Sequence, residues 1–232
     1  MLPPAITSLL PTTLTSFPFL PRYLSLIAQS SPLFWTLSNL DARLRLQTRE
    51  EIRRIQRETG ITTIFVTHDQ EEAMSISDMI VVMKLGVLQQ IGAPQEVYDD
   101  PHNLFVAKFL GTPPINVFDG VVVDGKLYIG DEAVLDIPGV ADQAVTVGIR
   151  PEGFQPEENG AMTCNLSSVE VMGRDSSVVS THAASLNPLV RSIIDSDIKI
   201  DMSSETVRFS LKPHKVFIFN KETEERIYFE VN

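Results

Sequence analysis

The sequence predicts a short α/β segment followed by an all-β domain, and two observations carry this prediction. Between residues 37 and 112, stretches with helical periodicity alternate with short apolar runs. Between residues 113 and 232, short runs of alternating apolar and polar residues are separated by turns rich in Gly and Asp. That spacing is typical of a barrel or sandwich.

The charge of the chain changes near the same boundary. Residues 1–111 carry 9 Lys and Arg against 11 Asp and Glu, whereas residues 112–232 carry 10 against 19, and the whole chain has a net charge of −11. A surface as acidic as that of the second part repels a phosphate backbone. We therefore expect no nucleic acid among the partners of this protein.

The single cysteine, Cys164, excludes an internal disulfide and suits a reducing compartment. No histidine or acidic residue lies near it in the sequence. We therefore expect Cys164 to be a buried apolar residue rather than a nucleophile.

Residues 1–36 are apolar, but six prolines interrupt every possible helix. No unbroken stretch approaches the ~20 apolar residues of a membrane span. The basic start and the small-residue cleavage pattern of a secretion signal are missing as well. The sequence indicates a Pro-rich, poorly ordered tail.

A helix is predicted from residue 37 onward, with Ser38 as its N-cap and Gly60 as its end. The run "ITTIFVT", residues 61–67, is predicted to be a fully apolar strand of the kind found inside parallel sheets. The elements expected next are a helix from residue 70, strands over 79–83 and 87–92 joined at Gly86, and two short helices over 93–101 and 103–111.

His68 directly follows the predicted strand over 61–67. Ligands bind at the carboxyl-end edge of open α/β sheets, and an imidazole there can hydrogen-bond a substrate oxygen without carrying a full charge. The alternative is that His68 simply caps the next helix. The pattern alone leaves both interpretations open.

The stretch "GVVVDGKL", residues 120–127, fits the phosphate-loop pattern G-x-x-x-x-G-K except at its last position. Three consecutive valines favour a strand, and Asp124 would bring the wrong charge to a phosphate. The pair Asp124 and Gly125 between two apolar runs is typical of a hairpin turn. We predict a β-hairpin here.

Several motifs together resemble a known family. They are "LSNLDARLR" (37–45), "FVTHDQEEAM" (65–74), "GVLQQIGAPQEVYDDP" (86–101), "FVAKFLGTPPINVF" (105–118) and "VGIRPE" (147–152). In this order they are similar to the ATP-binding subunits of carbohydrate-import ABC transporters of the maltose and multiple-sugar type. The resemblance runs from Leu37 to the C-terminus.

The resemblance implies an α/β remnant of an ABC nucleotide-binding domain over 37–112, followed over 113–232 by an all-β OB-like barrel, the transport-associated OB domain. By the same resemblance, Ser38, Asn39, Leu40 and Asp41 match the D-loop at the dimer interface. His68 matches the switch histidine that touches the γ-phosphate of ATP. In the full-length family the cofactors are ATP and Mg²⁺.

The departures from the family concern nucleotide binding. No phosphate loop and no Gly-rich signature are found, and the place of the family's Asp-Glu-Pro strand reads "SPLFWT". We therefore expect no tight binding of ATP and no ATP hydrolysis by this chain alone, and no residue is assigned to cofactor binding. Residues 1–36 are interpreted as sequence foreign to the family, from a shifted reading frame, a wrong start site or a damaged gene.

Within the β domain, the predicted strands include "AVTVGIRPE", "IKIDM" (198–202), "TVRFSLKPHKVFIFN" and "RIYFEV". Arg150 has three open interpretations: a structural ion pair, a sugar contact or neither. His102, His182 and His214 lie too far apart in the sequence for ligand-like spacing, so no metal site is expected.

The resemblance implies a C-terminal portion of the ATP-hydrolysing subunit of a sugar importer. Its partners would be a second ATPase subunit, identical or related, and membrane permease subunits, and its place would be the cytoplasmic face of the cell membrane. One alternative is a stand-alone OB-like module that dimerises, senses a sugar or receives a regulatory protein. Another is a non-functional gene product.

Overall fold

The computed structural model describes the backbone of residues 42–230 and the side chains from residue 46 to residue 230. Two compact units divide between Thr63 and Ile64. In the first unit, helix α3 spans Ala42–Thr59, and Gly60 follows it at φ +63° with its N–H donated to the carbonyl of Gln56 at 2.9 Å. The predicted helix and its glycine end are confirmed, and the predicted cap Ser38 lies outside the described residues.

Short elements open the second unit. They are α4 (Gln70–Ile76), β1 (Ile80–Lys84), β2 (Val87–Gly92), α5 (Pro94–Asp99) and α6 (Leu104–Phe109). β1 and β2 form an antiparallel hairpin whose turn residues, Leu85 and Gly86, both have positive φ. Positive φ at both turn residues matches the twist of paired strands. Gly86 lies in this turn, as the sequence predicts.

Residues 61–67 do not form the predicted strand. Ile64 is 88% exposed and Val66 is 83% exposed, although both belong to an apolar run. Within residues 42–230 no strand pairs with this segment, so its backbone groups have no ladder partners and its side chains have no second layer. The prediction of a buried parallel strand is wrong for this structure.

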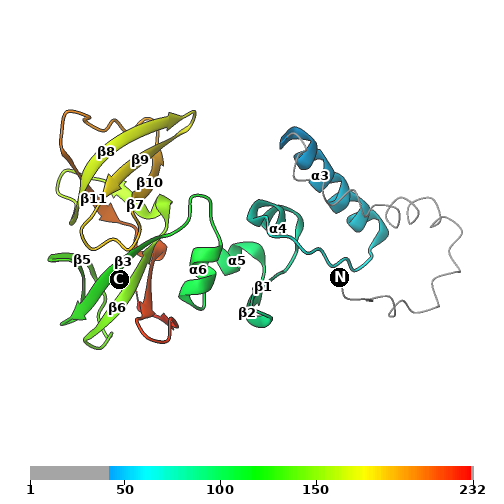
Figure 1. The fold of residues 1–232 in the computed structure, drawn as a ribbon, viewed down its shortest axis with the longest axis horizontal. Coiled ribbons are helices and arrows are strands. Elements are labelled where there is room, and N and C mark those ends of the chain that lie inside the picture. Colours follow the sequence, from blue (N-terminus) through cyan, green and yellow to red (C-terminus); the bar gives the residue numbers. More distant parts are fainter. Residues whose placement is uncertain (1–41, 231–232) are drawn as a thin grey trace, which may run out of the picture. The chain divides into compact units, whose positions relative to one another are not determined.

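The β domain follows from residue 116 (Figure 1). Its strands are β3 (Asn116–Val123), β4 (Lys126–Ile129), β5 (Glu132–Asp136), β6 (Gln143–Ile149), β7 (Phe154–Pro156), β8 (Met162–Met172), β9 (Asp175–Thr181), β10 (Val190–Asp195), β11 (Thr206–Leu211), β12 (Val216–Asn220) and β13 (Arg226–Ile227). They pair antiparallel in a five-stranded sheet of order β10-β9-β8-β11-β7 and a six-stranded sheet of order β13-β12-β6-β3-β4-β5. The structure is thus mostly β with a barrel-like domain, consistent with the predicted OB-like fold.

The two sheets enclose one apolar core. Phe154 from β7 meets Phe209 from β11 edge to face, with ring centroids 5.3 Å apart. Cys164 lies in this core at 1% exposure, and burial raises the pKa of its thiol to about 11. Cys164 is therefore a buried apolar residue, as predicted, and a thiol with so high a pKa is a poor nucleophile at neutral pH.

Two local predictions in the β domain have opposite outcomes. The hairpin over residues 120–127 is confirmed as β3 and β4, with Asp124 at φ +51° and Gly125 at φ +72° in its turn. The strand predicted over 198–202 is wrong, because this stretch runs between two turns: Asp195 accepts from the N–H groups of Asp197 and Ile198, and Asp201 accepts from the N–H of Ser203. The sheet uses β10 there instead, which the sequence analysis missed.

The six-stranded sheet also packs on its outer side. Side chains alternate along a strand, so Phe217 and Phe219 of β12 point away from the core that Ile218 faces. These two rings, together with Ile115 and Val117, cover Leu104 and Ala107 of α6. Val106 on another face of this helix and Leu110, its C-cap, belong to a separate small cluster with the β1–β2 hairpin. Helix α6 therefore joins the hairpin to the β domain.

Candidate functional site

His68 lies exposed in a bend immediately before α4. Asp69, not His68, is the N-cap of this helix: its carboxylate accepts from the N–H of Glu72 at 3.0 Å. The hydroxyl of Thr67 accepts from the N–H of Asp69 at 2.9 Å and donates to the Glu72 carboxylate at 2.8 Å. The interpretation of His68 as a cap is therefore wrong, and its two neighbours hold the backbone of the bend while its imidazole remains in solvent.

The predicted D-loop residues Ser38, Asn39, Leu40 and Asp41 lie outside the described residues. The side chain of Gln70, two residues after His68, accepts from the N–H of Gly111 at 2.8 Å. This bond links the first turn of α4 to the segment that follows α6. The histidine bend is thereby connected to the β domain through α6.

Arg150 is fully buried between the short helices and the β domain, at 0% exposure. Its guanidinium donates to the main-chain carbonyls of Ala107 (2.9 Å), Leu110 and Tyr98 (2.7 Å). These carbonyls lie at the C-terminal ends of α6 and α5, where the last helical C=O groups have no partner within the helix. Burial lowers the pKa of Arg150. The N–H groups of Arg150 supply hydrogen bonds to three carbonyls that have no partner within their helices. Arg150 is a structural residue, but the ion pair that one interpretation proposed is not found among the described residues, because its hydrogen-bond partners are main-chain carbonyls.

Tyr98 completes this arrangement. Its ring lies 3.8 Å from the guanidinium carbon of Arg150, and its hydroxyl donates to the carboxylate of Glu152 at 3.1 Å. Burial raises the pKa of Tyr98 to about 12. Lys215 reaches both Asp99 (2.8 Å) and Glu152 (3.4 Å) from the far side. We call Tyr98, Arg150, Glu152 and Lys215 the Arg150 junction.

The residues of the stretch "VGIRPE" pack against both sides of the six-stranded sheet. Val147 and Ile149 face the core between the sheets. A side chain at Gly148 would meet Ile115 at 2.8 Å and Phe219 at 3.2 Å, so only glycine lets this outer layer close. The sequence analysis missed Tyr98 and Lys215. No signal in the sequence around Arg150 indicates these two residues, because both lie far from it along the chain.

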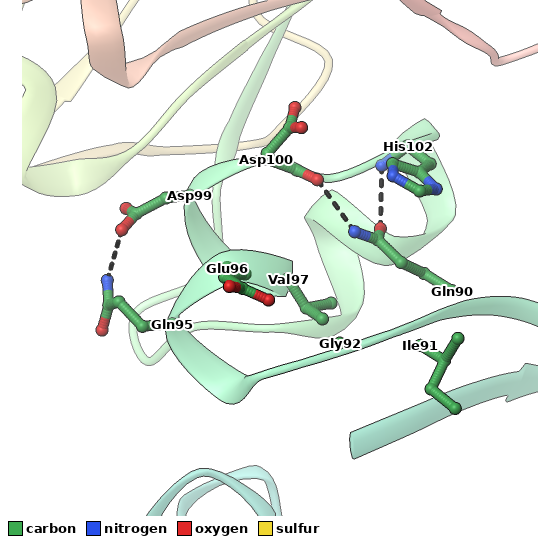
Figure 2. Close-up of a pocket in the computed structure, with 9 residues that line it drawn as sticks. All are labelled: Gln90, Ile91, Gly92, Gln95, Glu96, Val97, Asp99, Asp100 and His102. Carbon is green, nitrogen blue, oxygen red and sulfur yellow. Dashed lines mark hydrogen bonds between the residues drawn. The ribbon is translucent and has the colours of Figure 1, made fainter. Parts of the chain in front are cut away.

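A groove of about 470 Å³ lies beside this junction, between β2 and α5 (Figure 2). Its acidic side chains are Glu96, Asp99 and Asp100, and its amide Gln90 donates to the carbonyl of Asp100 at 2.9 Å and accepts from the N–H of His102 at 2.9 Å. Hydrogen bonds from Lys215 and Gln95 hold the pKa of Asp99 below its usual value, against the opposing effect of burial. Three carboxylates repel a triphosphate, so this groove does not fit a nucleotide.

Between residues 46 and 230, no group of three or more His, Cys, Asp and Glu side chains is arranged to hold a metal ion. The one stretch with a phosphate-loop pattern is the β3–β4 hairpin. His68 is the one predicted nucleotide contact that lies among the residues that the structure describes. None of the helices in this part of the chain is long and apolar enough to cross a membrane.

Comparison with known proteins identifies relatives of this chain. The CysA C-terminal regulatory domain matches residues 116–154. The diacetylchitobiose uptake system ATP-binding protein MsiK of Streptomyces coelicolor is 36% identical over 214 residues, which cover 82% of this chain and 57% of the relative. The trehalose/maltose import ATP-binding protein MalK of Thermococcus litoralis is 49% identical over 126 residues, covering 50% of this chain and 34% of that protein.

A putative ABC transporter ATP-binding protein of Mycoplasma pneumoniae is 42% identical over 199 residues, with 82% of this chain and 33% of the relative covered. The chain thus spans between a third and somewhat over half of the length of these relatives. The matching regulatory domain begins at β3 and ends at Phe154, so it contains the whole of the "VGIRPE" stretch. The chain is therefore homologous to the ATP-binding subunits of sugar-import ABC transporters, and residues 116–154 correspond to a C-terminal regulatory domain of that kind.

Proposed function

We propose that this chain is the C-terminal portion of the ATP-binding subunit of a sugar importer, and that it supplies the switch histidine and the regulatory domain. The observation that carries the proposal is the homology to MsiK and MalK together with the exposed imidazole of His68 on a braced bend. Like these relatives, the subunit would act with a second ATPase subunit and with membrane permease subunits at the cytoplasmic face of the membrane.

The role of His68 follows from what its imidazole can do. A neutral imidazole both donates and accepts hydrogen bonds, so one ring nitrogen can donate to a terminal phosphate oxygen while the other accepts from a water molecule. ATP would supply the terminal phosphoryl group, and Mg²⁺ would neutralise part of the negative charge of that group. The bonds of Thr67 and Asp69 fix the direction of the bend, so a phosphate held by the rest of a nucleotide-binding domain would meet an oriented side chain.

The Arg150 junction would connect this histidine to the regulatory domain. The chain of contacts runs from α4 through Gln70 to Gly111, and from Leu110 to Arg150. Its members are buried or half-buried, so a shift of α4 is transmitted to β6 as a displacement of packed groups. We propose that nucleotide state and regulatory state are coupled along this route.

A split-subunit experiment tests the function. The purified chain is mixed with an N-terminal fragment of MsiK that ends before the matching region, and ATP hydrolysis is measured with either component alone and with the mixture. We expect hydrolysis only in the mixture, with a loss of about 10²-fold or more for His68→Ala, since positioning of the attacking group dominates phosphoryl transfer.

Lys126→Gln is the matched control, because Lys126 lies exposed on the β3–β4 hairpin, far along the chain from the bend. Its mixture should hydrolyse ATP as fast as the unaltered one. Hydrolysis by the chain alone at a rate that His68→Ala reduces would overturn the proposal that the triphosphate site is supplied from outside this chain.

A second candidate function is a stand-alone regulatory module that dimerises, receives a regulatory protein or senses a sugar. The match of residues 116–154 to a regulatory domain favours it. Light scattering and calorimetry with maltose, trehalose and diacetylchitobiose test it on the full chain. The full chain is required, because a cut at residue 112 would remove the carbonyl partners of the buried Arg150. A monomer inert to every sugar and partner removes this candidate.

A further inference from the structure

A second groove, of about 310 Å³, has the opposite charge to the acidic groove beside α5. It is lined by Lys84, Phe105, Lys108, Phe109 and Glu224. Both lysines are exposed, and neither forms a salt bridge within residues 46–230. On a chain with a net charge of −11, two unpaired ammonium groups beside one hollow attract anions to that place.

The wall of this groove is aromatic. Phe105 and Phe109 lie one helical turn apart on α6 and stack with centroids 5.7 Å apart and planes 18° apart. The ammonium of Lys84 lies 4.9 Å from the Phe105 centroid, while Phe109 is 40% exposed. The buried positions at α6 are Leu104, Val106, Ala107 and Leu110, whereas Phe105 is half-buried and packs against the hairpin cluster and Phe109 is exposed. One ring is therefore already covered by a cation, and the other remains available to a ligand.

The rim of the groove is fixed by backbone bonds. Glu224 has φ +59°, a left-handed conformation that costs a non-glycine residue of order 1 kcal/mol. Its N–H donates to the carbonyl of Asn220 at 3.0 Å, and its own carbonyl accepts from the N–H of Leu104 at 2.9 Å. Asn103 completes the link through a β-bridge to Glu225. The β12–β13 turn and the start of α6 thus form one rigid edge, and the groove is preformed.

We propose that this groove binds a single-ring aromatic carboxylate, with its ring against Phe109 and its carboxylate between Lys84 and Lys108. The volume lies at the lower end of the range for ligand pockets, which suits one ring rather than a nucleotide. The carboxylate belongs either to a free small molecule or to the C-terminal phenylalanine of a peptide. This proposal is independent of the nucleotide role assigned to His68.

Nuclear magnetic resonance titration of the full chain tests the groove with a matched pair of probes. N-acetyl-phenylalanine carries the ring and the carboxylate, and N-acetyl-phenylalanine amide carries the ring alone. We expect the acid to shift the amide signals of residues 105–109 in a saturable way and the neutral amide to bind at least about 2- to 5-fold more weakly. A tetrapeptide ending in phenylalanine separates the two sources: tighter binding than the free acid indicates a peptide ligand, and equal or weaker binding indicates a free one.

Charge variants sharpen the test because their expected effects differ in sign. Lys84→Gln and Lys108→Gln should each weaken binding of the acid by about 2- to 5-fold. Glu224→Gln should strengthen it by about 2-fold, since it removes the one negative charge among the lining residues. Lys126→Gln is the control and should leave the affinity unchanged. Equal affinity for the acid and the amide, shifts that map elsewhere, or no shifts with either the acid or the peptide would overturn the proposal.

Discussion

Two apolar runs of similar composition differ in structure: one forms a buried strand, and the other forms no strand and is exposed. Residues 143–149, "QAVTVGI", form β6 between β12 and β3, and Val145, Val147 and Ile149 are fully buried. Residues 61–67, "ITTIFVT", form no strand, and Ile64 is 88% exposed. The comparison shows that a β-branched composition favours a strand but does not suffice to form one. The segment also needs neighbouring strands to pair with and a second layer to pack against.

The largest predicted difference compares one substitution in the two runs. Ile149→Ala removes a side chain at 0% exposure from the core and should cost about 2–5 kcal/mol of the free energy of unfolding. Ile64→Ala should change it by no more than about 0.5 kcal/mol. Urea denaturation midpoints of the two variants measure both effects. Equal costs would mean that residues 61–67 are packed in solution and that the contrast is absent.

The next effect concerns the Arg150 junction. Arg150→Met should destabilise the protein by about 2–4 kcal/mol, because the carbonyls of Tyr98, Ala107 and Leu110 lose their donor while they remain buried. Hydrogen exchange of the Leu110 amide should increase before that of β6, which shows that the helices detach first.

Arg191→Met is the control for the loss of a guanidinium. Arg191 is 40% exposed and faces Glu170 at 3.7 Å, so its loss should cost at most about 1 kcal/mol. Arg150→Lys should recover only part of the stability, because an ammonium lacks the forked geometry that reaches two helices at once. Full recovery with lysine would contradict the assignment of the three carbonyl bonds.

A smaller effect is expected at the histidine bend. Asp69→Ala removes the side-chain cap of α4 and should cost about 1 kcal/mol, whereas His68→Ala should leave stability within about 0.5 kcal/mol. Thermal unfolding of both variants measures this difference. If His68→Ala were as destabilising as Asp69→Ala, the imidazole would be a structural group rather than a solvent-facing one.

A further effect is a dependence of stability on alkaline pH. Burial raises the pKa of Tyr98 from 10 to about 12, with opposition from Arg150 and support from Glu152. Because the folded state keeps a proton that the unfolded chain has lost, stability falls as the pH rises from about 10 to about 12. Tyr98→Phe should remove this part of the decline, while Tyr128→Phe, the control for the loss of a phenol, should not. Parallel pH curves for Tyr98→Phe and the unaltered protein would contradict the burial of this hydroxyl.

Much of the fold follows from local patterns in the sequence. The glycine after α3, the turn at Leu85 and Gly86, the hairpin at Asp124 and Gly125, and the short helices before the β domain are each determined within a few residues. The failures depend on distant partners. Residues 61–67 have the composition of a buried strand without a described neighbour. Residues 198–202 belong to no sheet and run between turns in which Asp195 and Asp201 accept main-chain N–H groups.

The candidate site shows the same limit. The resemblance indicates His68 as a site residue. The alternative that His68 caps α4 is wrong, because Asp69 is the cap, and the hydrogen bond from the N–H of Glu72 to Asp69 is needed to see this. The partners of Arg150 lie about 40 to 50 residues away, at helix ends whose carbonyls carry no side-chain signal in the sequence. Composition and spacing cannot indicate a contact that one side chain makes to main-chain atoms so far along the chain.

The central proposal is that this chain presents a histidine to a triphosphate that it does not hold by itself. Calorimetric titration of the purified chain with MgATP tests it most directly. The account predicts no saturable heat and a dissociation constant above about 1 mM. Stoichiometric binding with a micromolar dissociation constant, weakened by His68→Ala, would contradict it.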